Sequence, residues 1–160
     1  MTEQERTPDG RYVVVDGRRW RASDPNIPER LQAELVKELM TARRLVKTRG
    51  DDVRFRVQDA KVALGERGEE WWEPTDQGRR TRLESVIRAL LRHRDGSTIC
   101  PSDAARAVGG EDWRDLMDAA REVAGELAEQ GQVRITQKGE DVDIHARGPI
   151  RLGAGPDLRT

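Results

Sequence analysis

Cysteine, aromatic residues and long apolar runs are all scarce in this sequence. One Cys among 160 residues excludes an internal disulfide, and it excludes a Cys-rich metal site as well. No segment approaches the roughly 20 apolar residues that a membrane-spanning helix requires. Residues 1–10 are polar and acidic and lack the apolar centre of a signal peptide. We therefore expect a cytoplasmic protein that does not bind membranes.

A strong charge of one sign is also lacking, because 29 Lys and Arg residues are balanced by 30 Asp and Glu residues, for a net charge of −1. The chain as a whole therefore does not have the charge of a basic nucleic-acid-binding protein. Its length allows one domain or two small ones, each with a modest apolar core. Aromatic residues form only 4% of the chain, but 4 residues are Trp, which we expect to be packing anchors or contact points.

Sequence motifs of catalysis are missing too. The chain has no Gly-rich phosphate loop, nucleophile elbow or metalloprotease helix, so we expect neither an enzyme nor a cofactor. His93 and His145 lack the spacing of a metal site. Cys100 lies at a predicted helix start, where a thiolate would be stabilised. A reactive role would also need a base that no pattern supplies, so we favour a structural Cys.

The stretch from Arg79 to Leu152 has the element order of a winged helix-turn-helix. Apolar residues with helical spacing predict a first helix from Arg79 to Arg94, which Asp95-Gly96 ends. A short β segment then leads to Pro101, which is typical of a first helical position. The second helix ends at Gly109-Gly110. A third helix is predicted from Glu111 to about Gln130, with Trp113 on its apolar face.

After this third helix, apolar and polar residues alternate on both sides of residues 137–140. Val133 and Ile135 lie before this Gly-containing turn, and Val142 and Ile144 lie after it, which predicts a β-hairpin, the wing. Residues 147–151 are expected to return along the sheet as a third strand. Helices followed by such a hairpin indicate the winged-helix fold.

Four separate motifs in this stretch are similar to one protein family. Residues 98–103, 113–117, 135–139 and 147–152 resemble, in matching order, a small bacterial family named domain of unknown function 3253. The resemblance covers Arg79 to Leu152. It implies a winged-helix-like fold and brings no established activity.

The first half of the chain predicts a β-hairpin followed by two helices. Asp16-Gly17 provides a type I′ turn that would place Val13 opposite Trp20, and we expect Trp20 in a core position. Apolar residues with helical spacing predict a helix from Pro28 to Gly50 and a second from Val53 to Gly65, with a strand at residues 53–57 as the alternative. Residues 10–73 also resemble short bacterial hairpin-plus-two-helix segments.

Together these patterns predict an α+β fold, in which a β-hairpin plus αα-hairpin unit precedes a winged helix-turn-helix domain. The Trp71-Trp72 pair lies in the joint between them and is expected to fold back onto its own core; the alternative is a partner-binding segment. The predicted divisions are a disordered tail (1–10), the hairpin unit (11–76), the winged-helix domain (77–152) and a C-terminal tail (153–160).

The first helix of the second unit is strongly basic, with six Arg against one Glu between Arg79 and Arg94. Such a helix could neutralise phosphates, or it could be a solvated face. The wing tip is either a plain turn or a DNA contact, and Arg147 and Arg151 could bind a phosphate or, as we favour, a carboxylate of this protein. The candidate nucleic-acid-binding residues are Arg79, Arg80, Arg82, Gln137, Lys138, Arg147 and Arg151.

The third helix is acidic, with six carboxylates against two Arg between Asp112 and Glu129, and this opposes ordinary major-groove recognition. Two hypotheses follow. The first is a DNA-associated regulatory protein that contacts double-stranded DNA through the basic helix and the wing. The second is a protein–protein interaction module without nucleic-acid binding. A homodimer is compatible with either hypothesis.

Overall fold

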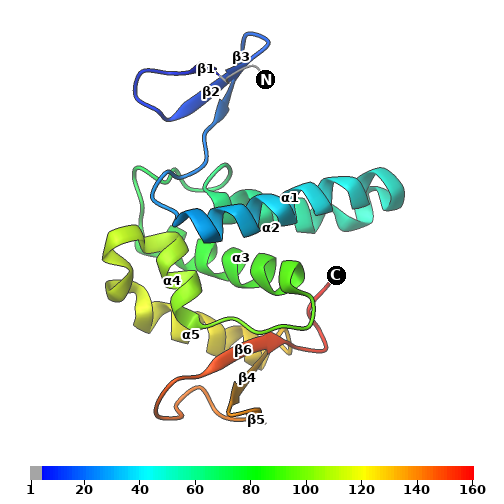
Figure 1. The fold of residues 1–160 in the computed structure, drawn as a ribbon, viewed down its shortest axis with the longest axis vertical. Coiled ribbons are helices and arrows are strands. Elements are labelled where there is room, and N and C mark those ends of the chain that lie inside the picture. Colours follow the sequence, from blue (N-terminus) through cyan, green and yellow to red (C-terminus); the bar gives the residue numbers. More distant parts are fainter. Residues whose placement is uncertain (1–4) are drawn as a thin grey trace.

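The computed structural model describes residues 5–160 and confirms the mixed α+β class (Figure 1). Strands β1 (Glu5–Arg6), β2 (Tyr12–Val15) and β3 (Arg18–Arg21) form an antiparallel sheet in that order. The predicted register is confirmed, with Val13 opposite Trp20. Strand β1 pairs with β2 and lies inside the expected tail, so the prediction of disorder is wrong at residues 5–6; residues 1–4 lie outside the described range.

The two predicted helices of the first half are confirmed. Helix α1 (Glu29–Arg49) is followed by the 3-10 turn η1 (Gly50–Val53) and by α2 (Arg54–Leu64), which excludes the alternative strand. Leu31, Leu35 and Leu39 are buried at the spacing of one helical face. Helix α2 ends at Gly65, whose φ of 81° is left-handed and favours glycine.

Helix α3 (Asp76–Arg94) lies at the centre of the molecule, between the α1–α2 pair and the elements that follow it (Figure 1). Next come α4 (Pro101–Gly109), the 3-10 segment η2 (Gly110–Leu116) and α5 (Met117–Glu129). The predicted third helix is therefore wrong over its first turns. Gly110 has a φ of 58° and Asp112 departs from helical angles, so a continuous α-helix cannot begin there.

A second antiparallel sheet closes the chain. Strands β4 (Val133–Gln137), β5 (Glu140–Asp141) and β6 (Arg151–Ala154) are arranged in the order β5-β4-β6, and Ile99 bridges to Leu152 of β6. The predicted hairpin is correct only at its tip, where Gln137 pairs with Glu140. The main partner of β4 is β6, because Leu152 is fully buried whereas Val142 and Ile144 are only partly buried.

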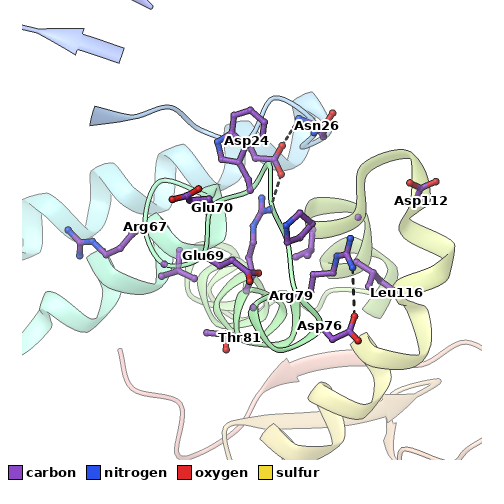
Figure 2. A pocket seen from close by; sticks show the side chains of 18 of the residues that line it. Asp24, Asn26, Arg67, Glu69, Glu70, Asp76, Arg79, Thr81, Asp112 and Leu116 are labelled. Atoms are coloured by element: carbon purple, nitrogen blue, oxygen red, sulfur yellow. Dashed lines mark hydrogen bonds and ion pairs between the residues drawn. The ribbon is translucent and has the colours of Figure 1, made fainter. Parts of the chain in front are cut away.

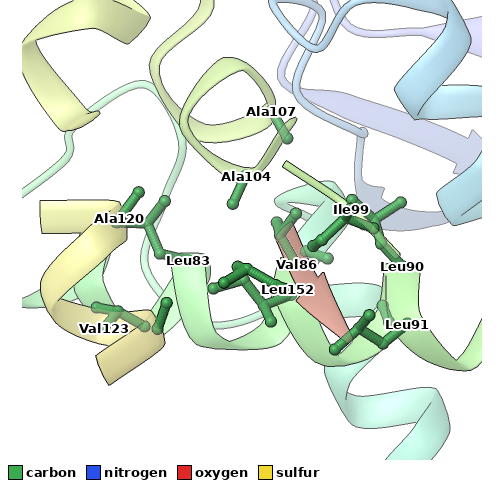
Figure 3. Close-up of a cluster of buried hydrophobic side chains, with 14 of the residues drawn as sticks. Leu83, Val86, Leu90, Leu91, Ile99, Ala104, Ala107, Ala120, Val123 and Leu152 are labelled. Atoms are coloured by element: carbon green, nitrogen blue, oxygen red, sulfur yellow. The ribbon is translucent and has the colours of Figure 1, made fainter. Parts of the chain in front are cut away.

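One contiguous apolar cluster joins both halves of the described chain. It includes Leu35 and Leu64 from the first half, and Leu83, Leu90, Ile99 and Leu152 from the second half. Figure 3 shows Leu83, Val86 and Leu90 of α3 facing Ile99, Ala104 and Leu152. The C-terminal residues also join this cluster, since Leu158 is buried. Helix α3 therefore contributes to a core shared by the two predicted units.

The joint between the halves folds back onto the first half, as we favoured. Trp71 Nε1 donates a hydrogen bond to the Ala22 carbonyl (3.0 Å), and the Trp72 ring meets Tyr12 edge-on with centroids 5.7 Å apart. Within residues 5–160, no helix is both long enough and apolar enough to cross a membrane.

Candidate functional site

The basic residues of α3 are held in ion pairs within the protein. Their carboxylate partners come from the loop before α1, from α1, α2, α5 and from α3 itself. The pairs are Arg79–Asp76, Arg80–Glu122, Arg80–Glu126, Arg82–Asp24, Arg88–Asp59, Arg92–Asp59 and Arg94–Glu34. The helix that is most basic in the sequence is therefore largely neutralised in the structure.

Arg82 is buried, and its guanidinium group is used entirely within the core. Arg82 Nη1 donates to Asp24 Oδ2 (2.8 Å), and its other nitrogens donate to the carbonyl oxygens of Ala63 and Ala107. Only 8% of Arg82 and 3% of Asp24 are exposed. Burial lowers the pKa of Arg82, and the negative charge of Asp24 opposes this shift. Arg82 cannot contact a phosphate at the surface, so that prediction is wrong.

Arg80 and Arg79 lie nearer to solvent than Arg82. Arg80 donates one hydrogen bond to Glu122 and one to Glu126, each at 2.8 Å, and the hydrogen bond to Glu122 is the main cause of its raised pKa. Arg79 is 3.9 Å from Asp76. The guanidinium of Arg80 already binds two carboxylates of α5, so only Arg79 of the three α3 candidates remains weakly held.

The four candidates on the β4–β6 segment occupy different positions. Gln137 Nε2 donates to the carbonyl oxygens of Arg147 (2.7 Å) and Pro149 (3.0 Å), so it braces the loop of residues 138–150. Arg151 donates to the hydroxyl and carbonyl of Thr98 and to the Cys100 sulfur. The internal role that we favoured for Arg151 is therefore supported, although its partners are not carboxylates.

Lys138 and Arg147 are the exposed cations of this loop, and no ion pair of either is found within residues 5–160. Lys138 adopts a φ of 53° at the turn between β4 and β5, which directs the chain back toward the sheet. Among the sequence-predicted candidates, these two residues remain the most accessible to a ligand.

The exposed side of α5 carries a row of carboxylates, which we call the acidic stripe: Asp118, Glu122, Glu126 and Glu129. Their spacing of three and four residues places them along one side of the helix. Beside the stripe, α5 and the 138–150 loop enclose a groove of about 340 Å³. Its apolar lining comes from Ala128, Ile135, Val142 and Ile144, and its charged lining from Glu129, Arg134, Asp141 and Asp143.

A larger polar cavity of about 760 Å³ lies where the joint meets the start of α3 and the α4–η2 segment. Figure 2 shows Asp24, Glu69, Asp76 and Leu116 around it. Every buried polar side-chain atom of the described residues has a hydrogen-bond partner, and these residues form no cluster with the composition of a metal site. The cavity therefore presents no group that requires a ligand.

Cys100 occupies the expected N-cap position of α4. Its backbone N–H donates to Asp103 Oδ2 (3.0 Å), and its sulfur accepts a hydrogen bond from Arg151. His93 lies 3.9 Å from Glu34, and the backbone of His145 donates to Asp143. The contacts of Cys100 are those of a structural residue that links α4 to β6.

Sequence reasoning missed a surface in the first half. Trp20 was expected in the core, but it is 45% exposed, and the Arg18 guanidinium lies 4.3 Å from its ring centroid. The prediction was wrong because the apolar side of this hairpin is short: Val13 is buried whereas Val15 is 41% exposed. The Arg residues on both sides of Trp20 in β3 were the signal that could have identified this surface.

The structure is that of an α+β protein. Its second half contains, in chain order, helix α3, the Ile99 β-bridge, helices α4 and α5, and a small antiparallel sheet. Residues 80–155 match the family described as "Protein of unknown function (DUF3253)", which confirms the resemblance read from the four motifs. The match begins within α3 and extends through β6, and it excludes β1–β3, α1 and α2. A comparison with curated proteins finds no match.

Proposed function

We propose that this protein is a cytoplasmic protein–protein interaction module of the winged-helix type, whose α5 surface binds a basic and apolar segment of a partner protein. The observation that carries the proposal is the contrast between two helices. The cations of α3 are paired internally, whereas all four carboxylates of the acidic stripe are exposed and two of them, Asp118 and Glu129, form no ion pair within residues 5–160. A helix with this charge opposes entry into a DNA major groove.

The groove beside α5 supplies the contacts that such a segment needs. Its apolar wall of Ile135, Val142 and Ile144 can bury aliphatic side chains. Glu129 and Asp143 at its rim can attract Lys or Arg of the partner. Arg121 donates to the carbonyl oxygens of Ile144 and Ala146, which fixes the loop wall relative to α5.

The test uses the full chain and a short fluorescein-labelled peptide of alternating Leu and Lys. We expect saturable binding by fluorescence anisotropy and no binding of the matched peptide of Leu and Glu. Glu129→Lys should weaken binding several-fold, because a like charge then faces the peptide. The matched control is Glu29→Lys on α1, which should leave the affinity unchanged. Equal affinity of the Leu–Glu peptide, or equal effects of the two variants, would refute the proposal.

Double-stranded DNA binding by the 138–150 loop is the second candidate function. It is favoured by Lys138 and Arg147, which are exposed and form no ion pair within the described residues. An electrophoretic mobility assay across a salt series tests it. A shift that is steep in salt and is weakened by Lys138→Ala supports this function; no shift at low salt contradicts it.

A further inference from the structure

A surface of different character lies on the first half, around the exposed indole of Trp20. Arg18 from the same sheet lies 4.3 Å from the ring centroid, and Lys61 Nζ of α2 lies 5.8 Å from it. The sheet β1–β3 projects from the α1–α2 pair, and one backbone segment leads from β3 to α1 (Figure 1). Trp20 is therefore presented to solvent beside two cations instead of being enclosed in the core.

Two further cations act on Lys61. Burial lowers the pKa of Lys61, and the positive charges of Arg67 and Arg43 lower it further. Glu66 is the carboxylate that opposes this effect, and it also accepts a hydrogen bond from the Ser23 hydroxyl. Three cations, Lys61, Arg43 and Arg67, therefore outnumber the one carboxylate, Glu66.

These cations differ from those of α3 because they form no ion pair with any carboxylate of residues 5–160. The guanidinium of Arg67 donates to the amide oxygen of Gln58 (2.7 Å), and both residues lie at the lining of the polar cavity (Figure 2). A neutral amide orients the guanidinium without cancelling its charge. We call this set the Trp20 patch: Arg18, Trp20, Arg43, Lys61 and Arg67.

We propose that the Trp20 patch is a binding site for single-stranded nucleic acid. Exposed aromatic rings flanked by cations provide the two contacts that such a strand needs, a stacking surface for a base and positive charge for its phosphates. Because the bases of a duplex are already stacked on one another, the exposed indole of Trp20 favours an unpaired strand. The charge-complementary alternative, an anionic lipid surface, offers no base to stack on Trp20.

The first experiment measures fluorescence anisotropy of labelled oligothymidylate and oligouridylate with the full chain at low salt. Trp20→Ala should weaken binding at least about fivefold, the lower end of what one stacked base contributes. Trp20→Phe should retain part of the affinity. The matched control is Trp113→Phe, because Trp113 also contacts two guanidinium groups, those of Arg106 (4.3 Å) and Arg114 (4.5 Å), in the second half of the chain.

The second experiment separates a local site from general electrostatic attraction. Arg67→Ala should reduce the slope of log affinity against log salt by about 0.7, the value for one phosphate contact of a single strand. Lys138→Ala, which removes an exposed cation on the other half, should leave the slope unchanged. Thermal unfolding of each variant verifies that its core is intact.

Any of four results with nucleic acid overturns the proposal: no oligonucleotide binding at low salt, equal effects of Trp20→Ala and Trp113→Phe, equal effects of Arg67→Ala and Lys138→Ala, or equal or tighter binding of a duplex of the same length. Vesicles containing phosphatidylserine provide the remaining comparison. Vesicle binding that is as tight as oligonucleotide binding and equally sensitive to Trp20→Ala would assign the patch to lipid and refute the nucleic-acid site.

Discussion

The arginines of α3 and those around Trp20 have the same chemistry and opposite environments. Arg82 and Arg92 of α3 are buried and bind carboxylates from other parts of the chain. Arg18 is exposed and lies over an indole instead. The comparison teaches that a run of basic residues in a sequence does not by itself make a basic surface, because the surrounding elements decide which charges are cancelled.

The physical cause of the difference is position in the fold. Helix α3 is surrounded by neighbours, so Asp24, Glu34, Asp59 and Glu122 reach it from different directions. The β1–β3 sheet projects from the molecule. Lys61 of α2 lies beside Trp20, and it is a cation and not a carboxylate. An arginine in the first environment stabilises the fold, whereas one in the second remains able to bind a ligand.

The largest effect is expected where an α3 arginine is most buried. Arg82→Ala should lower the free energy of unfolding by about 3–5 kcal/mol, because Asp24 would then be a buried charge without its partner. Urea denaturation measures this loss. The double variant Arg82→Met with Asp24→Asn should recover most of it, because no uncompensated charge remains. A loss below about 1 kcal/mol for Arg82→Ala would contradict the distinction between buried, paired arginines and exposed ones.

The next effect concerns pH. The Arg94 hydrogen bond is the main cause that lowers the pKa of Glu34 below its ordinary value of 4.5, and His93 and Arg30 add to it. The ionised carboxylate therefore stabilises the fold above about pH 4.5, and this contribution is lost as the pH falls through the lower folded-state pKa. Glu34→Gln should cost about 1 kcal/mol at neutral pH and progressively less in acid. Denaturation midpoints from neutral to acidic pH measure this difference.

The matched control for this pH dependence is Glu29→Gln. Glu29 is an exposed residue of the same helix, and it forms no ion pair within the described residues. Its replacement should leave the pH profile of stability unchanged. A Glu34→Gln variant that loses the same stability at every pH would contradict the assigned role of the Glu34 carboxylate.

A smaller effect is expected at Arg80, which is paired but lies nearer to solvent. Arg80→Ala should cost about 0.5 kcal/mol at low salt and less at high salt, because exposed ion pairs are screened. The same variant leaves Glu122 and Glu126 without their cation, so it should strengthen binding of the Leu–Lys peptide. Unfolding in two salt concentrations and peptide anisotropy measure both changes, and weaker peptide binding would count against the proposed α5 surface.

The smallest effect is expected for an arginine that binds no carboxylate. Arg44 of α1 is exposed, and its guanidinium donates to the Thr41 hydroxyl. Arg44→Ala should change the free energy of unfolding by no more than about 0.5 kcal/mol in either direction. Urea denaturation measures it beside Arg82→Ala. A loss comparable to that of Arg82→Ala would remove the distinction between the two groups of arginines.

Much of the fold was predictable because it rests on local patterns. The helical spacing of Leu31, Leu35 and Leu39, and the Asp16-Gly17 turn, each act over a few residues and were interpreted correctly. The pairing of β4 was only partly predictable. Its partner β6 lies beyond a loop of residues 138–150, and local alternation instead favoured Val142 and Ile144, which pack beside α5 without forming a strand.

The candidate site was less predictable than the fold. Lys138 is exposed, and so is Arg147, for which an internal carboxylate partner was favoured; Arg82 is buried and Gln137 braces a loop. A core position was also predicted for Trp20. Its pairing with Val13 indicates which face of the hairpin the two residues share, but it does not indicate whether another element covers Trp20. Coverage depends on contacts between distant segments, which periodicity does not record.

By itself, the sequence of this protein determined its helices, its turns and the row of carboxylates along α5, since these follow from backbone preferences and side-chain spacing. Only the tertiary structure decided which charged side chains are paired inside the protein and which remain exposed to solvent. An ion pair such as Asp24–Arg82 joins residues far apart in the chain, and its strength depends on the water that packing excludes. The number of charged residues thus follows from the sequence, whereas the surface potential depends on how the elements pack together.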